Sequence, residues 1–301
     1  MPIRAYSLLI LTSLIWAGNS VAGKIGVGHI DPILLTTLRW WSAALLIVAL
    51  SLKPLKQDWP VIRKHWPLLL AYGASGFALF NVLLYSALTH TSVINVMIEQ
   101  AGMPIMIFLG NFLLFRTRAT WSQLAGFACT FTGVLVTATQ GDIARLLKLQ
   151  LNIGDAMMLL AVVVYSAYTV CLKWKPVLHW QSFLAIPCIG AALTCIPFVA
   201  WQSIAHPLGW PDATGWAIVV YASVFVALVA SATYIAGIDL IGANRAAPFI
   251  NLLPIFGVGL SVLLLREPVH GFHIVALVLV TAGIVLAEWG RSRQKPAMDH
   301  V

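Results

Sequence analysis

The feature that most constrains this chain is that it stays apolar from one end to the other. Of its 301 residues, 60% are hydrophobic and only 9% are charged, a composition that water-soluble domains do not show. Roughly ten apolar stretches each approach the ~20 residues that a helix needs to cross ~30 Å of hydrocarbon. The sequence therefore predicts an all-α integral membrane protein with ten transmembrane helices.

The predicted spans leave only short connections and no room for an extramembrane domain. They cover residues 5–25, 32–51, 66–88, 92–114, 120–138, 154–174, 181–204, 214–238, 243–265 and 271–289. The four cysteines all lie inside these spans, which is typical of small buried side chains rather than of a disulfide or zinc framework. We expect no metal site.

Landmarks of the first half return in the second half at a nearly constant offset. A shift of 149 positions, with a slip to 150 near the end, brings several residue types into register: Val21, Lys24, Pro104, Arg116 and Gly133 fall on Val170, Lys173, Pro254, Arg266 and Gly283. We interpret this register as an internal duplication, with one five-helix repeat in residues 1–145 and the other in residues 146–301.

A repeat of five spans is odd, so its second copy must enter the membrane from the opposite side. Such inverted repeats are common in secondary transporters, whose substrate site lies near the bilayer midplane between the halves. The sequence contains no P-loop, H-E-x-x-H or G-x-G-x-x-G motif, and these are the signatures of ATP, zinc and dinucleotide sites. We therefore expect transport driven by gradients, with no cofactor.

Basic residues predict the orientation, because cytoplasmic connections are enriched in lysine and arginine. With a cytoplasmic N-terminus, the outer connections hold only Lys24, Arg145, Lys148 and Arg266, and the inner ones hold most of the remaining basic residues. Both termini should then lie in the cytoplasm. The net charge of +8 is spread over inner loops, where anionic lipid headgroups are the expected partners, and we expect no nucleic-acid partner.

Residues near both ends of the chain resemble the pattern of the drug/metabolite transporter superfamily, and specifically its EamA-type ten-helix members. These residues are Trp16, Asn19, Lys24, Pro32, Arg39, Pro254, Glu267 and Gly283. The resemblance covers the whole chain. In such proteins an acidic residue often follows span four as well as span nine, but here Thr117 stands opposite Glu267. We therefore expect Glu267 to serve loop structure.

Within that family the chain looks most like the YddG-type exporters of aromatic amino acids. The resemblance implies a bacterial inner-membrane protein in which spans 1, 3, 4, 6, 8 and 9 surround a central cavity and spans 5 and 10 are peripheral. A homodimer is compatible with the sequence but cannot be derived from it. The expected substrates are small amphipathic metabolites, most of all aromatic amino acids.

Deep aromatic and amide side chains are the candidates for lining that cavity, because apolar walls would accept a ring while amides orient a zwitterion. The candidates are Trp16, Asn19, Phe77, Asn81, Met103, Tyr165, Tyr168 and Asn251. Three prolines in spans four and nine, Pro104, Pro248 and Pro254, predict kinks where a gate could bend.

Glu99 and Arg39 each lie seven residues from the outer start of a span, so both should sit ~10 Å below the outer surface. Equal depth permits an ion pair between spans two and four, and an unpaired charge there is costly. The functional alternative is that Glu99 carries protons or binds the amino group of a substrate.

Other function classes have weaker support in the sequence. Gly73-Ala74-Ser75-Gly76 spells the G-x-S-G motif of intramembrane serine proteases, but such a serine needs a histidine base, and the candidate is His273 at the edge of span ten. Glycine and serine also allow close helix packing. A channel would need a charged ring or a filter-like loop, and the sequence shows neither. An exporter of another metabolite or drug class is the nearest alternative.

Overall fold

The computed structural model describes residues 2–116, 120–142, 152–205, 209–241 and 246–292, and every regular element in these ranges is helical. The first half contains α1 (Pro2–Ile25), α2 (Pro32–Leu50), α3 (Leu52–Tyr72), η1 (Gly73–Leu79), α4 (Phe80–Leu88), α5 (Val93–Gln100), α6 (Met103–Phe115) and α7 (Trp121–Ala138). The second half contains α9 (Ile153–Cys171), η2 (Leu172–Trp174), α10 (Trp180–Ala205), α11 (Ala213–Val220), η3 (Tyr221–Val229), α12 (Ala230–Ile241), η4 (Ala247–Leu252), α14 (Leu253–Leu260), η5 (Ser261–Leu265) and α15 (Gly271–Ser292).

The hydropathy reading of the spans is confirmed. Seven helical runs are long and apolar enough to cross a membrane, and the runs Phe249–Leu265 and Gly271–Leu286 are apolar but shorter. The third run is longer than predicted, since one continuous run extends from Leu52 to Leu88 over 37 residues. Its first part is the polar half of α3, with Lys53 and Lys56 exposed, which hydropathy alone does not identify as helix.

Polar side chains cap the helices at the boundaries that the sequence predicts. Asp31 accepts hydrogen bonds from the N–H groups of Ile33 (2.8 Å) and Leu34 (3.1 Å) at the start of α2. Ser92 accepts one from Asn95 at the start of α5. Such caps satisfy the free N–H groups of a first helical turn, so each of these spans begins at a defined residue.

The third and eighth spans carry the same irregularity at matching positions. Each contains a π-helical segment in mid-span, η1 in the first half and η3 in the second. The ends of the fourth and ninth spans also match, because Arg116 and Arg266 both close their helices in the left-handed conformation with φ 53°. An internal duplication predicts such paired features, since segments of common origin keep their local geometry.

The fourth and ninth spans are interrupted, and their prolines mark the interruptions. Helix α5 ends at Gln100, α6 begins at Met103, and Pro104 lies in the first turn of α6. Pro254 lies in the first turn of α14, directly after the 3₁₀ segment η4, and Pro248 lies in the first turn of η4. A proline is tolerated in a first turn because its missing N–H has no partner there. The three prolines thus lie where helical segments begin within the fourth and ninth spans, and their role in gating stays a prediction.

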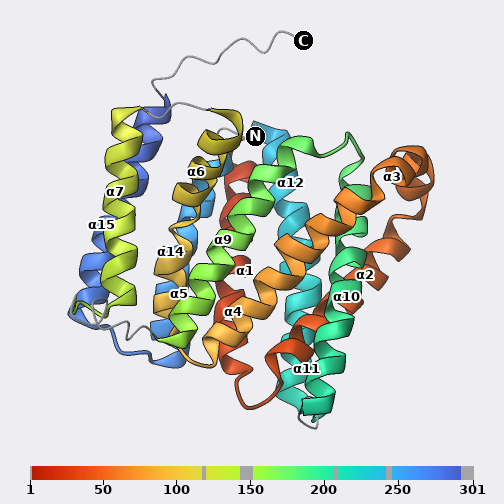
Figure 1. Ribbon diagram of the computed structural model, residues 1–301, viewed down its shortest axis with the longest axis horizontal. Coiled ribbons are helices and arrows are strands. Elements are labelled where there is room, and N and C mark those ends of the chain that lie inside the picture. The colour runs from red at the N-terminus through yellow and green to blue at the C-terminus, as the bar shows by residue number, and fades with distance from the viewer. Residues whose placement is uncertain (1, 117–119, 143–151, 206–208, 242–245, 293–301) are drawn as a thin grey trace.

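The helices form a bundle with one pair set apart at its edge. Figure 1 shows α7 and α15 side by side at the left, as the resemblance implied for spans five and ten. Their close approach depends on two glycines at equivalent positions in the two halves. A Cβ at Gly133 would meet the carbonyl oxygen of Ala276 at 2.9 Å, and one at Gly283 would meet that of Gly126 at 2.5 Å.

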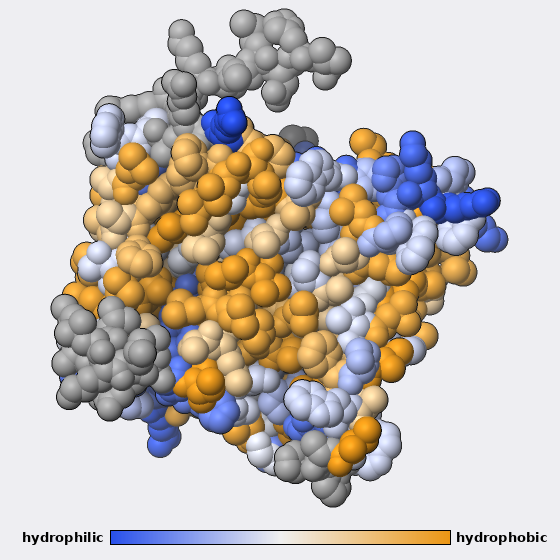
Figure 2. Space-filling model, viewed as in Figure 1, coloured by the Kyte–Doolittle hydropathy of each residue, from blue (hydrophilic) through white to orange (hydrophobic). Residues whose placement is uncertain are grey.

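The start of α1 and the end of α15 lie at the same end of the bundle (Figure 1). Hydrophilic residues gather at that end over α3 in Figure 2, where Lys53, Lys56, Arg63 and Lys64 are exposed. The middle of the same face is hydrophobic in Figure 2. A chain with both ends on one side has crossed an apolar layer an even number of times, as the span prediction requires.

Candidate functional site

Arg39 is the centre of a buried polar cluster between α1, α2 and α4. Its side chain is 4% exposed. The Nη1 group donates hydrogen bonds to Asn19 Oδ1 (3.2 Å), Asn81 Oδ1 (2.8 Å) and the Tyr85 hydroxyl oxygen (2.6 Å). The Tyr85 hydroxyl itself donates to Asn19 Oδ1 at 2.7 Å. All three partners are neutral, so none of them balances the positive charge of the Arg39 guanidinium.

The predicted ion pair between Arg39 and Glu99 is wrong. Arg39 forms no salt bridge with an acidic side chain among the described residues, and neither carboxylate oxygen of Glu99 has a hydrogen-bond partner there. The reason is helix packing: α2 packs mainly against α10 and α4, and α5 packs mainly against α14 and α9. An equal expected depth does not make two helices neighbours.

An uninterrupted row of aromatic rings leads away from Arg39. The guanidinium lies 4.6 Å from the centre of the Trp40 ring, which stacks on Phe77 at 4.8 Å and 14°. Phe77 meets Tyr168 edge to face at 6.0 Å, and Tyr168 contacts Tyr165 at 5.4 Å. Trp40 lies on α2, Phe77 on η1 and the two tyrosines on α9, and η1 contacts both of the other helices. The polar cluster and the aromatic row are therefore one contiguous site.

The structure brings together most of the predicted cavity residues. Asn19 and Asn81 are in the polar cluster, and Phe77, Tyr165 and Tyr168 are in the aromatic row. Met103 packs in the same core cluster as Tyr165. Trp16 contacts a different ring, that of Tyr234, at 5.3 Å.

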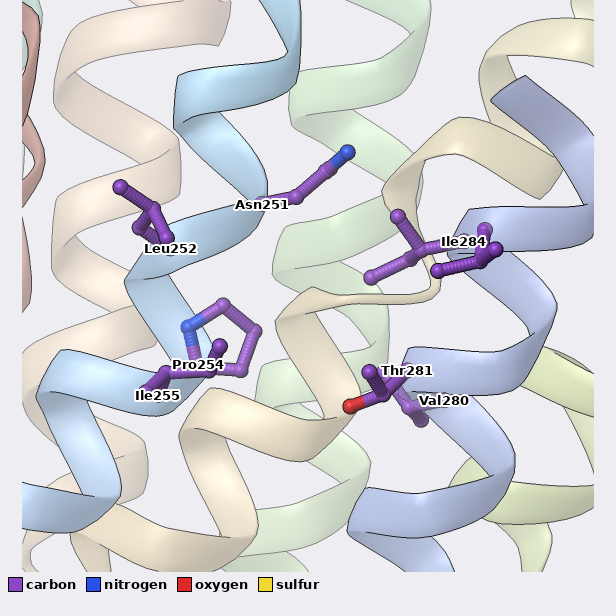
Figure 3. Close-up of a pocket in the computed structure, with 8 residues that line it drawn as sticks. Asn251, Leu252, Pro254, Ile255, Val280, Thr281 and Ile284 are labelled. Carbon is purple, nitrogen blue, oxygen red and sulfur yellow. The ribbon is translucent and has the colours of Figure 1, made fainter. Parts of the chain in front are cut away.

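Asn251 lies elsewhere, in a pocket of about 330 Å³ between η4, α14 and α15. Figure 3 shows its amide directed toward the side of α15, where Val280, Thr281 and Ile284 line the pocket. The lining is almost entirely aliphatic. The sequence places Asn251 at a suitable depth but does not show which face of its span the side chain occupies.

A second buried polar group lies at the end of the bundle opposite the start of α1. Asp155, at the start of α9, is fully buried and accepts hydrogen bonds from Thr91 (2.5 Å) and from the Asn95 amide (3.4 Å). The Oδ1 atom of Asn95 is 3.1 Å from His273 Nε2. Because His273 Nδ1 accepts from the backbone N–H of His270, the neutral ring carries its proton on Nε2 and donates it to Asn95.

Glu267 has the structural role that its position predicts. Its two carboxylate oxygens accept hydrogen bonds from the N–H groups of Val93 (2.9 Å) and Ile94 (3.2 Å), which open α5. Lys24 has a related role, since its ammonium donates to the carbonyl oxygens of Leu88 (2.8 Å) and Thr91 (2.7 Å) at the end of α4. These two charges thus hold the turn between α4 and α5. The symmetry-related Thr117 lies outside the described residues.

The serine-protease motif is used for packing in this structure. The Ser75 hydroxyl donates to the carbonyl oxygen of Ala71 at 2.7 Å, and His273 is bonded to Asn95 and His270 instead. A Cβ at Gly76 would clash with the ring of Tyr168 at 2.5 Å, so this glycine is needed where α9 approaches. The described residues also include no group of three or more histidine, cysteine or acidic side chains that could hold a metal ion.

Comparison with known proteins agrees with this architecture. The sequence model of the EamA-like transporter family matches the chain twice, over residues 3–139 and 152–289. The chain belongs to the EamA-like transporter family. It is therefore an integral membrane transporter, and the ten-helix repeat architecture of this family accounts for the shorter helices α7, α14 and α15 as membrane spans.

Named relatives of this EamA protein include exporters of amino-acid compounds. A probable amino-acid metabolite efflux pump of Escherichia coli (strain K12) is 25% identical over 94% of this chain and 94% of its own length. The transporter YetK of Bacillus subtilis (strain 168), whose function is uncharacterised, is 23% identical over 93% and 85%. A probable terminal-alkyne amino-acid exporter of Streptantibioticus cattleyicolor is 28% identical over 62% and 59%.

A solved crystal structure has the same fold. It aligns over 97% of this chain and 99% of its own, with a TM-score of 0.63 and 19% sequence identity. At this identity the likeness extends to the helical architecture and not to the residues of the site.

Sequence reasoning missed three members of the two polar groups. Tyr85 had a signal, because its position returns as Tyr234 in the second half at the same offset of 149. Thr91 and Asp155 lie at the ends of predicted spans, where polar residues are ordinary. Only their burial, 6% and 0% exposed, distinguishes them from interfacial residues.

Proposed function

We propose that this EamA protein exports aromatic amino acids by alternating access of its two halves, residues 1–145 and 146–301, around the site at Arg39. The observation that carries the proposal is a buried guanidinium that has no acidic partner among the described residues and lies next to a row of aromatic rings in contact. A charge inside a membrane protein is costly without a partner and marks a substrate pathway or site.

The free charge of Arg39 supports a carboxylate as the ligand. Its Nε has no hydrogen-bond partner among the described residues. A guanidinium offers a fork of N–H donors that fits the two oxygens of a carboxylate. The amide oxygens of Asn19 and Asn81 lie within 3.2 Å of Nη1, so acceptors for an amino group are present beside the carboxylate position.

The aromatic row supports a flat apolar side chain on the same ligand. Trp40, Phe77, Tyr168 and Tyr165 follow one another with ring centres 4.8 to 6.0 Å apart. Rings at these separations attract a further ring through offset or edge-to-face contacts worth about 0.5–1.5 kcal/mol each. An aromatic amino acid carries both groups: a ring for the aromatic row and a carboxylate that could pair with Arg39.

Proteoliposomes that contain the purified full chain test the proposal. We expect flux of radiolabelled phenylalanine that unlabelled tryptophan and 3-phenylpropionate inhibit, while phenethylamine, which lacks the carboxylate, inhibits weakly. Arg39→Gln should abolish the difference between the carboxylate and amine competitors. Arg63→Gln, which removes an exposed arginine of α3, is the matched control and should behave as wild type.

Two results would contradict the proposal. Absence of phenylalanine, tyrosine and tryptophan flux in folded wild-type protein would reject aromatic amino acids as substrates. Stronger inhibition by phenethylamine than by 3-phenylpropionate would favour export of another metabolite or drug class, with a cationic ligand.

A further inference from the structure

Two buried acidic residues, Glu99 and Asp155, are not part of the proposed substrate site at Arg39, and we call them the acidic pair. Glu99 is fully buried in α5, and neither of its carboxylate oxygens has a partner among the described residues. Asp155 is fully buried in α9, and its Oδ2 is also without a partner. The two groups share one helix contact, because α5 packs against α9, the Asn95 amide of α5 bonds to Asp155, and Glu99 follows Asn95 by one helical turn on the same face.

Two buried carboxyl groups with free oxygens cannot both be ionised at low cost. Burial of one unpartnered charge already costs several kcal/mol, and a second negative charge nearby adds repulsion. Such a pair holds a proton between its members, and the pair rather than either residue titrates. The free oxygens of Glu99 and Asp155 therefore indicate a place for a proton.

The other charged groups that the described residues place around α5 are bonded elsewhere, and the nearest carboxylate along the chain, Glu267, caps the first turn of α5. Helices α14 and α7, which pack against α5, contain no Asp, Glu, Lys, Arg or His. Helix α1 brings Lys24, whose ammonium is bonded to the carbonyls of Leu88 and Thr91. Helix α4 brings Tyr85, whose hydroxyl is bonded to Arg39 and Asn19.

The remaining neighbours of α5 are α15 and α9, and they contribute titratable side chains near a pocket. Helix α15 contributes His273, which donates to Asn95, and α9 contributes Asp155. A pocket of about 470 Å³ lies against them, and its lining includes Thr91, Asn95 and the titratable side chains of His90, Glu267, His270 and His273. Figure 1 shows the starts of α5, α9 and α15, which supply this lining, at one end of the bundle. Thr91 and Asn95 line the pocket and bond to Asp155, so a single layer of side chains separates Asp155 from the pocket.

We propose that Glu99 and Asp155 form a proton-binding site that is loaded from this pocket through the hydroxyl of Thr91. Thr91 lines the pocket and donates its own hydrogen to Asp155 Oδ1 at 2.5 Å. In the relay, the hydroxyl passes that proton to Asp155 and takes another from a hydronium ion in the pocket, which leaves as a neutral water molecule. Thr91 ends uncharged, and the pair gains one proton. Such a site supplies a coupling ion to a gradient-driven transporter.

The inference rests on membership of a transporter family and not on the aromatic substrate, so its test needs no substrate. Infrared difference spectra of the full chain in lipid membranes, recorded between mildly acidic and mildly alkaline buffer, detect the carbonyl stretch of a protonated carboxylic acid. We expect a titrating band in wild type that Glu99→Gln removes and Glu99→Asp shifts in frequency. Asp212→Asn removes an exposed carboxylate and should leave the band unchanged.

Exchange of the acid hydrogen for deuterium tests the route. Thr91→Val removes the hydroxyl at constant size and should slow the deuterium shift of the band at least tenfold, whereas Thr91→Ser should exchange at the wild-type rate. His90→Gln changes another residue of the same pocket and should have no effect. A band that persists in folded Glu99→Gln protein would overturn the site, and wild-type exchange in Thr91→Val would overturn the route.

Discussion

The carboxylate of Glu267 accepts a 2.9 Å hydrogen bond from the backbone N–H of Val93, a residue 174 positions earlier in the chain. A second bond from Ile94 completes the cap of α5. A residue that directly follows the ninth span thereby caps the first turn of the fourth span. Because α5 carries Glu99, this cap also fixes the helix that presents the acidic pair.

Replacement of Glu267 by alanine should lower the stability of the protein. The variant leaves two N–H groups at a helix start without partners, and loss of a helix cap costs about 0.5–2 kcal/mol. Thermal unfolding in a fixed lipid or detergent mixture should show a lower midpoint for Glu267→Ala than for Asp239→Ala, which removes an exposed carboxylate near the end of α12. Equal midpoints for the two variants would contradict the capping role.

The stability effects of changing Arg39 and Glu99 should be additive. The two side chains have separate partners, and substitutions at sites without shared partners add within about 0.3–0.5 kcal/mol. We expect Arg39→Met combined with Glu99→Gln to show the sum of the single free-energy changes in chemical unfolding. The pair Arg39→Met and Tyr85→Phe should instead show a coupling energy, because their side chains share a 2.6 Å hydrogen bond. If the double variant of Arg39 and Glu99 were more stable than the sum of the single changes predicts, that result would support the ion pair and contradict the structure.

The sequence predicts the spans well because hydrocarbon imposes one requirement along the whole chain: every backbone polar group must be bonded internally, over a fixed thickness. This requirement is readable residue by residue. The prolines indicate where the fourth and ninth spans are interrupted, but the sequence does not reveal the π-helical segment at Gly73–Leu79, because this segment is as apolar as a regular helix.

The site is less predictable because it depends on which helices are neighbours. The expected depths of Arg39, Glu99 and Asn251 suggested their surroundings, yet none of the three has the surroundings that depth alone suggests. The contact between Arg39 and Asn81 joins residues 42 positions apart, and that between His273 and Asn95 joins residues 178 apart. Pairings at such separations follow from the order of helices in the bundle, which the pattern of a single sequence does not contain.

Gly283→Ala should destabilise the pair formed by α7 and α15. The new Cβ would lie 2.5 Å from the carbonyl oxygen of Gly126 and 2.8 Å from the backbone nitrogen of Thr130, and backbone atoms cannot rotate away. Overpacking of this kind costs about 1–3 kcal/mol. Gly259→Ala is the matched control, since a Cβ there meets nothing within 4 Å and alanine favours helix over glycine by about 0.5–1 kcal/mol. The expected order of unfolding midpoints is Gly259→Ala at or above wild type and Gly283→Ala below it.

The last prediction concerns orientation: the end of the bundle that holds the start of α1, the end of α15 and the basic half of α3 should face the cytoplasm. Exposed Lys53, Lys56, Arg63 and Lys64 gather there, and cytoplasmic segments near spans are enriched in such residues. In a chain whose four cysteines are replaced by alanine, Val27→Cys probes the turn between α1 and α2, where residue 27 is 40% exposed, and Lys56→Cys probes α3. A maleimide that cannot cross membranes should label Val27→Cys in intact cells and Lys56→Cys only after permeabilisation. The reverse pattern would invert the topology and would place the pocket beside Thr91 and His273 on the cytoplasmic side, so that protons would load the acidic pair from the cell interior.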